Sequence, residues 1–191
     1  MRTFLTILIL FFTFQTWAKA DDIRDFEIEN MSLYDSALNY FSKKKIKNSE
    51  EDYYKDKKYT TATITSPEFK TYQQVQITYK YNDKKFILLD INGIVDKNYQ
   101  ECLEEIKKIS KDFTNLFPNT IKSDLATFPH WQDKSGKSKV TDVIWKFDNG
   151  DVIVLACYNW NTPFGKKKRY VDELRIAIGR KEFDEYLIRL N

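Results

Sequence analysis

The stretch VIWKFDNGDVIVLACY, residues 143–158, decides the fold. Every second residue of its first half is apolar, which is the pattern of a half-buried strand. Asn149-Gly150 is the strongest short-range signal for a hairpin turn, and residues 152–158 return as an almost continuous apolar run. The stretch therefore predicts a β-hairpin whose second strand is buried in a sheet.

Two further regions have strand patterns. Residues 75–81 alternate between apolar and polar side chains, and after a polar turn residues 86–94 form an apolar run that Asp90 and Asn92 interrupt. These segments predict a second hairpin. Residues 174–178 alternate again and predict one more strand.

Helical periodicity is clearest over residues 99–117, where apolar side chains recur every three or four positions until Pro118 ends the pattern. Residues 32–41 predict an earlier helix with a serine N-cap. Residues 43–58 are highly charged and predict a frayed helix end and a solvated loop, and residues 183–190 predict a short closing helix.

This order of helices and hairpins predicts an α+β fold, because hairpins build a mostly antiparallel sheet and amphipathic helices cover it. We expect two helices packed on one face of the sheet and a short C-terminal helix. Residues 21–191 are enough for a single domain with a substantial core.

The first twenty residues predict export. Arg2 precedes an apolar run over residues 4–14, and residues 18–20 have the small-x-small pattern that a signal peptidase requires. The run is too short to span a bilayer, and no second long apolar run follows it. We expect a cleaved signal peptide at 1–20, no transmembrane segment in the mature chain, and a periplasmic or secreted protein.

The charge of the chain argues against a nucleic-acid partner. Two of the 31 basic residues, Arg2 and Lys19, fall in the signal, so the mature chain would carry 29 basic residues against 28 acidic ones. Nucleic-acid binding requires a sustained basic surplus, which this balance does not provide.

The two cysteines, Cys102 and Cys157, allow one disulfide. An even number of cysteines in an oxidising compartment favours that bond. It would join the helix at 99–117 to the strand at 152–158. Two buried free thiols are the alternative.

Motifs of common catalytic and metal sites are missing from the sequence. His130 is the sole histidine, which excludes zinc sites built from two or three histidines. Residues 135–138, Ser-Gly-Lys-Ser, lack the upstream glycine of a phosphate-binding loop. Asp148 and Asp151 flank the hairpin turn and are better explained as turn formers than as calcium ligands. We assign no catalytic residue, no metal site and no cofactor.

The best binding candidate is the densest basic run after the signal, which lies beside two aromatic residues in an expected hairpin loop. The candidate binding residues are Trp160, Phe164, Lys166, Lys167, Lys168 and Arg169. Such a loop suits an acidic protein or an anionic envelope component, and the alternative is a solvated loop that keeps strand edges apart. The many aromatic residues could also form stacking platforms for sugars, but their alternating positions favour packing in the sheet.

Residues 26–42, FEIENMSLYDSALNYFS, with YNDKKF at 81–86, INGI at 91–94 and the helix containing Cys102, resemble small uncharacterised exported proteins of AT-rich marine alphaproteobacteria. The resemblance covers most of the mature chain and implies export and fold but no activity. Residues 28–41 also resemble the opening helix of BamE/SmpA-type outer-membrane assembly modules. In those modules glycine usually precedes the Met-Ser pair, where this chain has Asn30.

These observations favour an exported, non-catalytic protein that binds a partner or associates with the envelope. Two alternatives from other classes remain. One is a small exported hydrolase that uses His130 with Asp133 or Ser135, and the other is an inhibitor-like protein of the β-lactamase-inhibitor kind, built from similar helix-and-sheet units.

Overall fold

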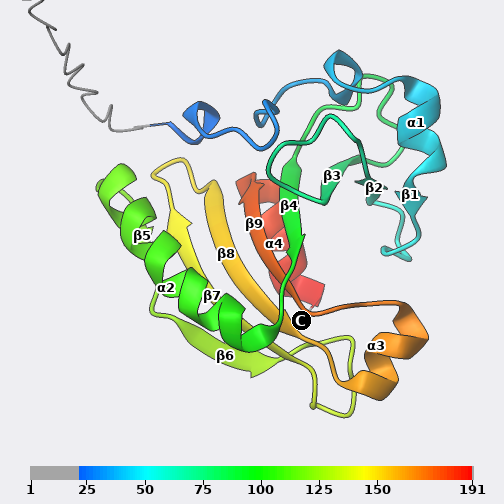
Figure 1. The fold of residues 1–191 in the computed structure, drawn as a ribbon. Helices are drawn as coiled ribbons and strands as arrows, with labels where there is room; N and C mark the ends of the chain where they lie inside the picture. Colours follow the sequence, from blue (N-terminus) through cyan, green and yellow to red (C-terminus); the bar gives the residue numbers. More distant parts are fainter. Residues whose placement is uncertain (1–21, 191) are drawn as a thin grey trace, which may run out of the picture.

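The computed structural model describes residues 22–190, and within them nine strands form one antiparallel sheet (Figure 1). The strand order is β1-β2-β3-β4-β9-β8-β7-β5, and β6 also pairs with β7. The predicted α+β class with a mostly antiparallel sheet is confirmed. The expected signal peptide at 1–20 lies outside the described residues.

The strands are β1 (Glu50–Glu51), β2 (Tyr59–Ile64), β3 (Gln74–Lys80), β4 (Asp90–Asp96), β5 (Ile121–Lys122), β6 (Ala126–Pro129), β7 (Lys139–Lys146), β8 (Val152–Asn159) and β9 (Glu173–Gly179). The α-helices are α1 (Lys43–Asn48), α2 (Tyr99–Leu116), α3 (Thr162–Lys168) and α4 (Lys181–Leu190). Two short 3-10 helices span Ile23–Asp25 and Ala37–Asn39.

Both predicted hairpins form. Strands β7 and β8 pair along their whole length, and Lys146 lies opposite Val152 beside the turn. Gly150 in the turn has a φ of 87°, which favours glycine. Strand β3 pairs with β4 in the same antiparallel manner. Strand β9 then lies between β4 and β8, so it joins the two hairpins into one sheet.

The apolar face of the sheet holds the core. Strand residues alternate between the two faces, and those on this face include Ile77, Leu155 and Trp145, all fully buried. Helix α2 packs here, and Phe113 of the helix lies edge-to-face with Trp145, with ring centroids 5.4 Å apart. The predicted disulfide is confirmed: Cys102 of α2 and Cys157 of β8 are bonded, with Cα atoms 5.8 Å apart.

The predicted helix at 32–41 is wrong. Tyr34 has a φ of 75°, which a right-handed helix does not allow, and only three residues of this segment form a 3-10 helix. The segment instead lies along residues 86–88, where the Tyr34 and Ala37 amides donate to carbonyl oxygens. Helix α1 follows in the charged region that was expected to be a frayed end and a loop.

The expected strand start at residue 86 is also wrong, because Phe86 has a φ of 52° and β4 begins only at Asp90. Strands β1, β2, β5 and β6 were not predicted from the sequence. Helix α3 occupies the position of the expected hairpin loop.

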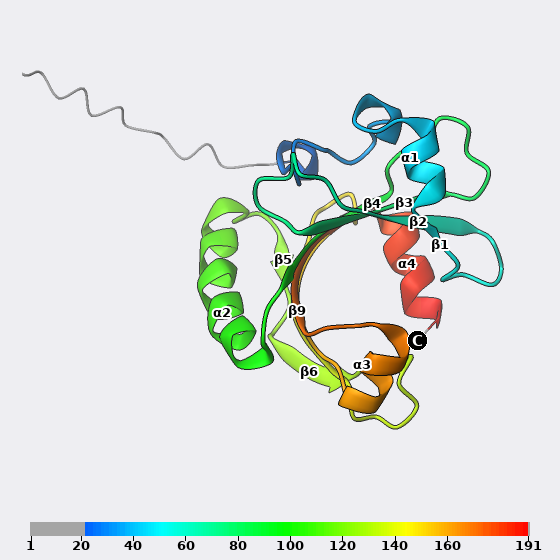
Figure 2. The same ribbon diagram turned by 45° about the vertical axis from the view of Figure 1, so that its right-hand side comes forward.

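The helices do not all lie on one face. The sheet curves, and α2 lies outside the curve while α3 and α4 lie inside it (Figure 2). Helix α4 covers one end of the inner face, where Phe183 and Tyr186 pack against Tyr59 of β2. Between residues 22 and 190, no helix is both long and apolar enough to cross a membrane.

Candidate functional site

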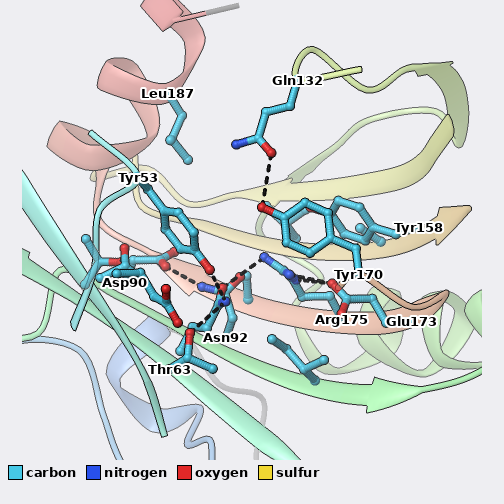
Figure 3. Close-up of a pocket in the computed structure, with 18 of the residues that line it drawn as sticks. Tyr53, Thr63, Asp90, Asn92, Gln132, Tyr158, Tyr170, Glu173, Arg175 and Leu187 are labelled. Atoms are coloured by element: carbon cyan, nitrogen blue, oxygen red, sulfur yellow. Dashed lines mark hydrogen bonds and ion pairs between the residues drawn. The ribbon is translucent and has the colours of Figure 1, made fainter. Parts of the chain in front are cut away.

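A cavity of about 580 Å³ lies on the inner, concave face of the sheet (Figure 3). Strands β2, β3, β4, β8 and β9 form its floor. Helix α4 contributes to one wall, and residues 130–132 and 168–171 contribute to another. Tyr53 and Tyr54, which precede β2, also line it.

Strand register explains how the floor is assembled. Gln76 of β3 lies opposite Asn92 of β4, which lies opposite Ala177 of β9. On the other side of β9, Arg175 lies opposite Ala156 of β8. Residues that are directly opposite in an antiparallel sheet point to the same face, so Gln76, Asn92 and Arg175 point to the same face of three neighbouring strands.

Arg175 is the centre of this polar floor. Its Nε donates to Glu173 Oε1 at 3.1 Å, its Nη2 donates to the same oxygen, and its Nη1 donates to Gln76 Oε1 at 3.2 Å. The guanidinium carbon lies 4.7 Å from the ring centroid of Tyr158. The Arg175 side chain is only 21% exposed, so its contacts hold it in one orientation.

Gln76 connects this network to Tyr53, which lines the cavity. Its Nε2 donates to Thr63 Oγ1 at 3.2 Å and to the Tyr53 hydroxyl at 3.3 Å. Tyr53 and Tyr170 lie on opposite sides of the Arg175 side chain in Figure 3. The floor therefore connects directly to an aromatic wall.

Asp90 forms a second polar centre. It is 8% exposed and accepts a hydrogen bond from Asn92 Nδ2. Burial raises the pKa of the Asp90 carboxyl to about 7, so a substantial fraction is protonated at neutral pH. A Cβ atom at Gly179 would lie 3.2 Å from Asp90 Oδ1, so the glycine makes room for the carboxyl group.

An aromatic cluster forms the wall near α3. The Trp160 ring centroid lies 4.5 Å from that of His130 and 4.6 Å from that of Tyr170, and Tyr158 stacks on Trp160. Trp160 Nε1 is buried without a hydrogen-bond partner among the described residues. Burial, together with the charge of Arg175, lowers the pKa of His130 to about 4, so this imidazole is neutral at ordinary pH.

Three of the six predicted binding residues line the cavity and three do not. Trp160, Lys168 and Arg169 line the cavity. Phe164 does not line it but stacks on Trp160, with centroids 5.9 Å apart. Lys166 and Lys167 are exposed in the last turn of α3 and do not line the cavity either.

The residues considered for a hydrolase are not arranged as a catalytic constellation. Asp133 accepts hydrogen bonds from the hydroxyl groups of Ser135 and Ser138, each at 2.7 Å. These bonds hold the pKa of the Asp133 carboxyl well below its usual range. His130 Nδ1 accepts from the amide of Gln132 at 3.2 Å, so its contact supports the loop.

Carboxylates in the described range do not gather into a metal site: residues 22–190 contain no group of three or more His, Cys, Asp or Glu side chains that could hold an ion. Asp151 accepts from the Tyr34 hydroxyl at 2.6 Å and from the Lys181 amide at 2.9 Å. It therefore ties the β7–β8 turn to α4 and to the N-terminal segment.

The sequence did not identify the floor residues Gln76, Asp90, Asn92 and Arg175. Their alternation with apolar residues predicted a solvent-exposed face, and this alternation is the same whether a face meets water or a cavity. The two polar residues inside the apolar run of β4 were the available signal, since polar side chains in a central strand require a reason.

Comparison with known proteins identifies no relative: no protein-family model, no curated protein and no solved structure matches the chain.

Proposed function

We propose that this chain is an exported, non-catalytic protein that binds a small molecule in the cavity on the concave face of its sheet. The observation that carries the proposal is the hydrogen-bonded cluster of polar side chains around Arg175, which faces a cavity instead of a packed core. Cavities of this size, with aromatic walls and a few fixed polar groups, are typical small-molecule sites.

The polar network supports binding because it is already organised. Arg175, Gln76 and Tyr53 are held by one another through hydrogen bonds. A ligand would not have to order these side chains, and preorganisation of this kind raises affinity. The N–H groups of Arg175 that contact neither Glu173 nor Gln76 provide further donors at the cavity.

The export part of the proposal rests on the signal pattern at 1–20 and is supported by the Cys102–Cys157 disulfide. Among the residues considered for a hydrolase, Asp133 is engaged by two serines and leaves His130 without a carboxylate partner, so binding is the better explanation. The basic turn of α3 remains available for an anionic envelope component, beside the cavity.

The test uses the mature protein, residues 21–191, with its disulfide intact. A panel of uncharged sugars, sugar acids, nucleosides, amino acids and fatty acids is screened by thermal shift and by tryptophan fluorescence. Trp131 and Trp160 line the cavity while Trp145 lies in the core, so a bound ligand should change the emission. We expect at least one compound to raise Tm and change the fluorescence.

The variant Val154→Trp fills the cavity from the floor, because Val154 lines it. It should abolish binding, whereas the matched control Lys166→Ala/Lys167→Ala, on exposed residues outside the cavity, should bind as the wild type does. Circular dichroism verifies that both variants fold, and Tyr170→Leu serves as a second cavity variant. The proposal is wrong if no compound binds, or if binding is the same in every variant.

A further inference from the structure

From the cavity lining we propose that the ligand is an uncharged saccharide of one or two rings, whose hydroxyl groups contact the floor around Arg175 and Gln76 and whose ring faces pack against Tyr53 and Tyr170. This inference rests on the proposed binding function and names the class of its ligand. It is argued from the charges, the hydrogen-bonding groups and the aromatic rings of the residues that line the cavity.

The charges of the lining are nearly balanced. Its acidic residues are Glu51, Asp90, Glu173 and Asp184, and its basic residues are Lys168, Arg169 and Arg175. Glu173 already pairs with Arg175, so the innermost cation is compensated within the protein. A strongly anionic or cationic ligand would therefore find no excess of opposite charge on the floor.

The floor provides planar polar groups that match neighbouring hydroxyl groups. Gln76, Asn92 and Arg175 present amide and guanidinium groups, and Asp90 and Glu173 present carboxyl groups. Hydroxyl groups of a sugar ring are both donors and acceptors, so they can bond the atoms of these groups that are not already engaged. Both amide hydrogens of Gln76 go to Thr63 and Tyr53, so Gln76 can only accept through Oε1. Each terminal nitrogen of Arg175 has two hydrogens and uses one of them toward Glu173 or Gln76, which leaves one for a ligand. Only Oε1 of Glu173 accepts from Arg175, so Oε2 has no donor among residues 22–190.

The aromatic residues complete the match. Tyr53 and Tyr170 lie on opposite sides of the floor, one on each wall, and both line the cavity (Figure 3). A sugar ring carries C–H groups on its faces and hydroxyls on its edge, so it can stack on tyrosine while its edge meets the floor. A fatty acid chain would instead need a continuous apolar tunnel, and here Thr61, Thr78 and Asn92 interrupt the apolar lining.

The experiment titrates the mature protein with cellobiose, maltose, lactose and N,N′-diacetylchitobiose, and with digalacturonate and laurate as charged comparators. Binding is measured by isothermal titration calorimetry. We expect at least one neutral disaccharide to bind with a Kd below about 1 mM and more tightly than either comparator. Val154→Trp should abolish that binding.

Two matched variants of Tyr170 separate ring stacking from hydrogen bonding. Tyr170→Phe removes the hydroxyl that donates to Gln132 at 3.4 Å and should change the Kd by less than about threefold. Tyr170→Leu removes the ring and should weaken binding by about tenfold or more. Arg175→Lys keeps the charge but loses the planar fork and should weaken binding similarly.

The outcomes distinguish the two proposals. If laurate or digalacturonate binds and Val154→Trp blocks it while no neutral sugar binds, the saccharide class is wrong and the binding function stands. If no compound binds at all, both are wrong. Sugar binding that Tyr170→Leu and Arg175→Lys leave unchanged overturns the placement of the sugar in this cavity.

A last experiment distinguishes a polysaccharide from a free sugar as the source of the ligand. Either result supports the saccharide class. Affinity electrophoresis through soluble starch or hydroxyethyl cellulose retards the protein if it takes a unit of a polysaccharide. If maltose or cellobiose binds and the polymer with the same linkage causes no retardation, the ligand is a free sugar.

Discussion

The two faces of the sheet are made by the same strands but have opposite characters. On β8, Leu155 and Cys157 point to the outer face, where α2 and the N-terminal segment bury them completely. Val154 and Ala156 point to the inner face and line the cavity. The outer face is apolar and buried, whereas the inner face holds a network of polar side chains beside open space.

The difference separates a face that stabilises the fold from a face that we propose binds a ligand. Buried polar groups such as Thr78, Asp90 and Asn92 stabilise a fold less than apolar packing does, and their desolvation has to be offset by hydrogen bonds. A sheet that carries them together on one face gives up packing energy there. Local departures of this kind from the rules of stability are expected at functional sites.

The largest expected effect comes from removing the disulfide on the outer face. Replacing both cysteines, Cys102→Ser with Cys157→Ser, removes a bond that spans 55 residues of sequence and joins α2 to β8. On the chain-entropy model the free energy of unfolding should fall by about 4 kcal/mol. Urea unfolding followed by tryptophan fluorescence measures it, with the reduced wild type as the control. A loss below about 1 kcal/mol would show that α2 is held by packing alone.

A neighbouring pair of residues compares the faces directly. Leu155→Ala should lower the free energy of unfolding by about 3 kcal/mol, because it leaves a hole in a close-packed core. Val154→Ala, one residue away on the cavity side, should lower it by about 1 kcal/mol or less, because Val154 is only half-buried. Urea titrations of both variants test this, and equal losses would contradict the distinction between the faces.

The sequence predicted the parts of the fold that depend on local pattern. The β7–β8 turn at Asn149-Gly150, the helix α2 and the Cys102–Cys157 bond all have signals within a few residues or a single possible pairing. The apolar residues of the helix expected at 32–41 are spaced as in a helix, yet Ala37 is buried while Tyr34 and Leu38 are exposed, and the segment forms only a 3-10 helix at Ala37–Asn39. Periodicity alone does not distinguish these cases.

Much less of the cavity than of the fold could be predicted from the sequence. Trp160, Lys168 and Arg169 were chosen for the basic run and do line the cavity, but Arg175 and Gln76, which form its centre, were not chosen. These two residues are 99 positions apart and meet only because β9 and β3 flank β4. No local pattern encodes that meeting, since it depends on the order of strands in the sheet.

The pH dependence of stability sharpens the comparison further. Burial raises the pKa of Asp90 from 3.8 to about 7, while Arg175 and Asn92 oppose the shift and Asp184 adds to it. Between these two pH values the folded state binds more protons than the unfolded state, so stability contributed by this group falls as pH rises, by up to about 1.4 kcal/mol per pH unit. Asp90→Asn keeps an acceptor for Asn92 and cannot ionise, so its urea midpoint should fall less than that of the wild type between pH 4.5 and 7.5.

Asp148→Asn, on the exposed β7–β8 turn, is the control and should follow the wild type. Parallel curves for all three proteins would mean that the inner face keeps Asp90 solvated and that its buried carboxyl group does not weaken the fold.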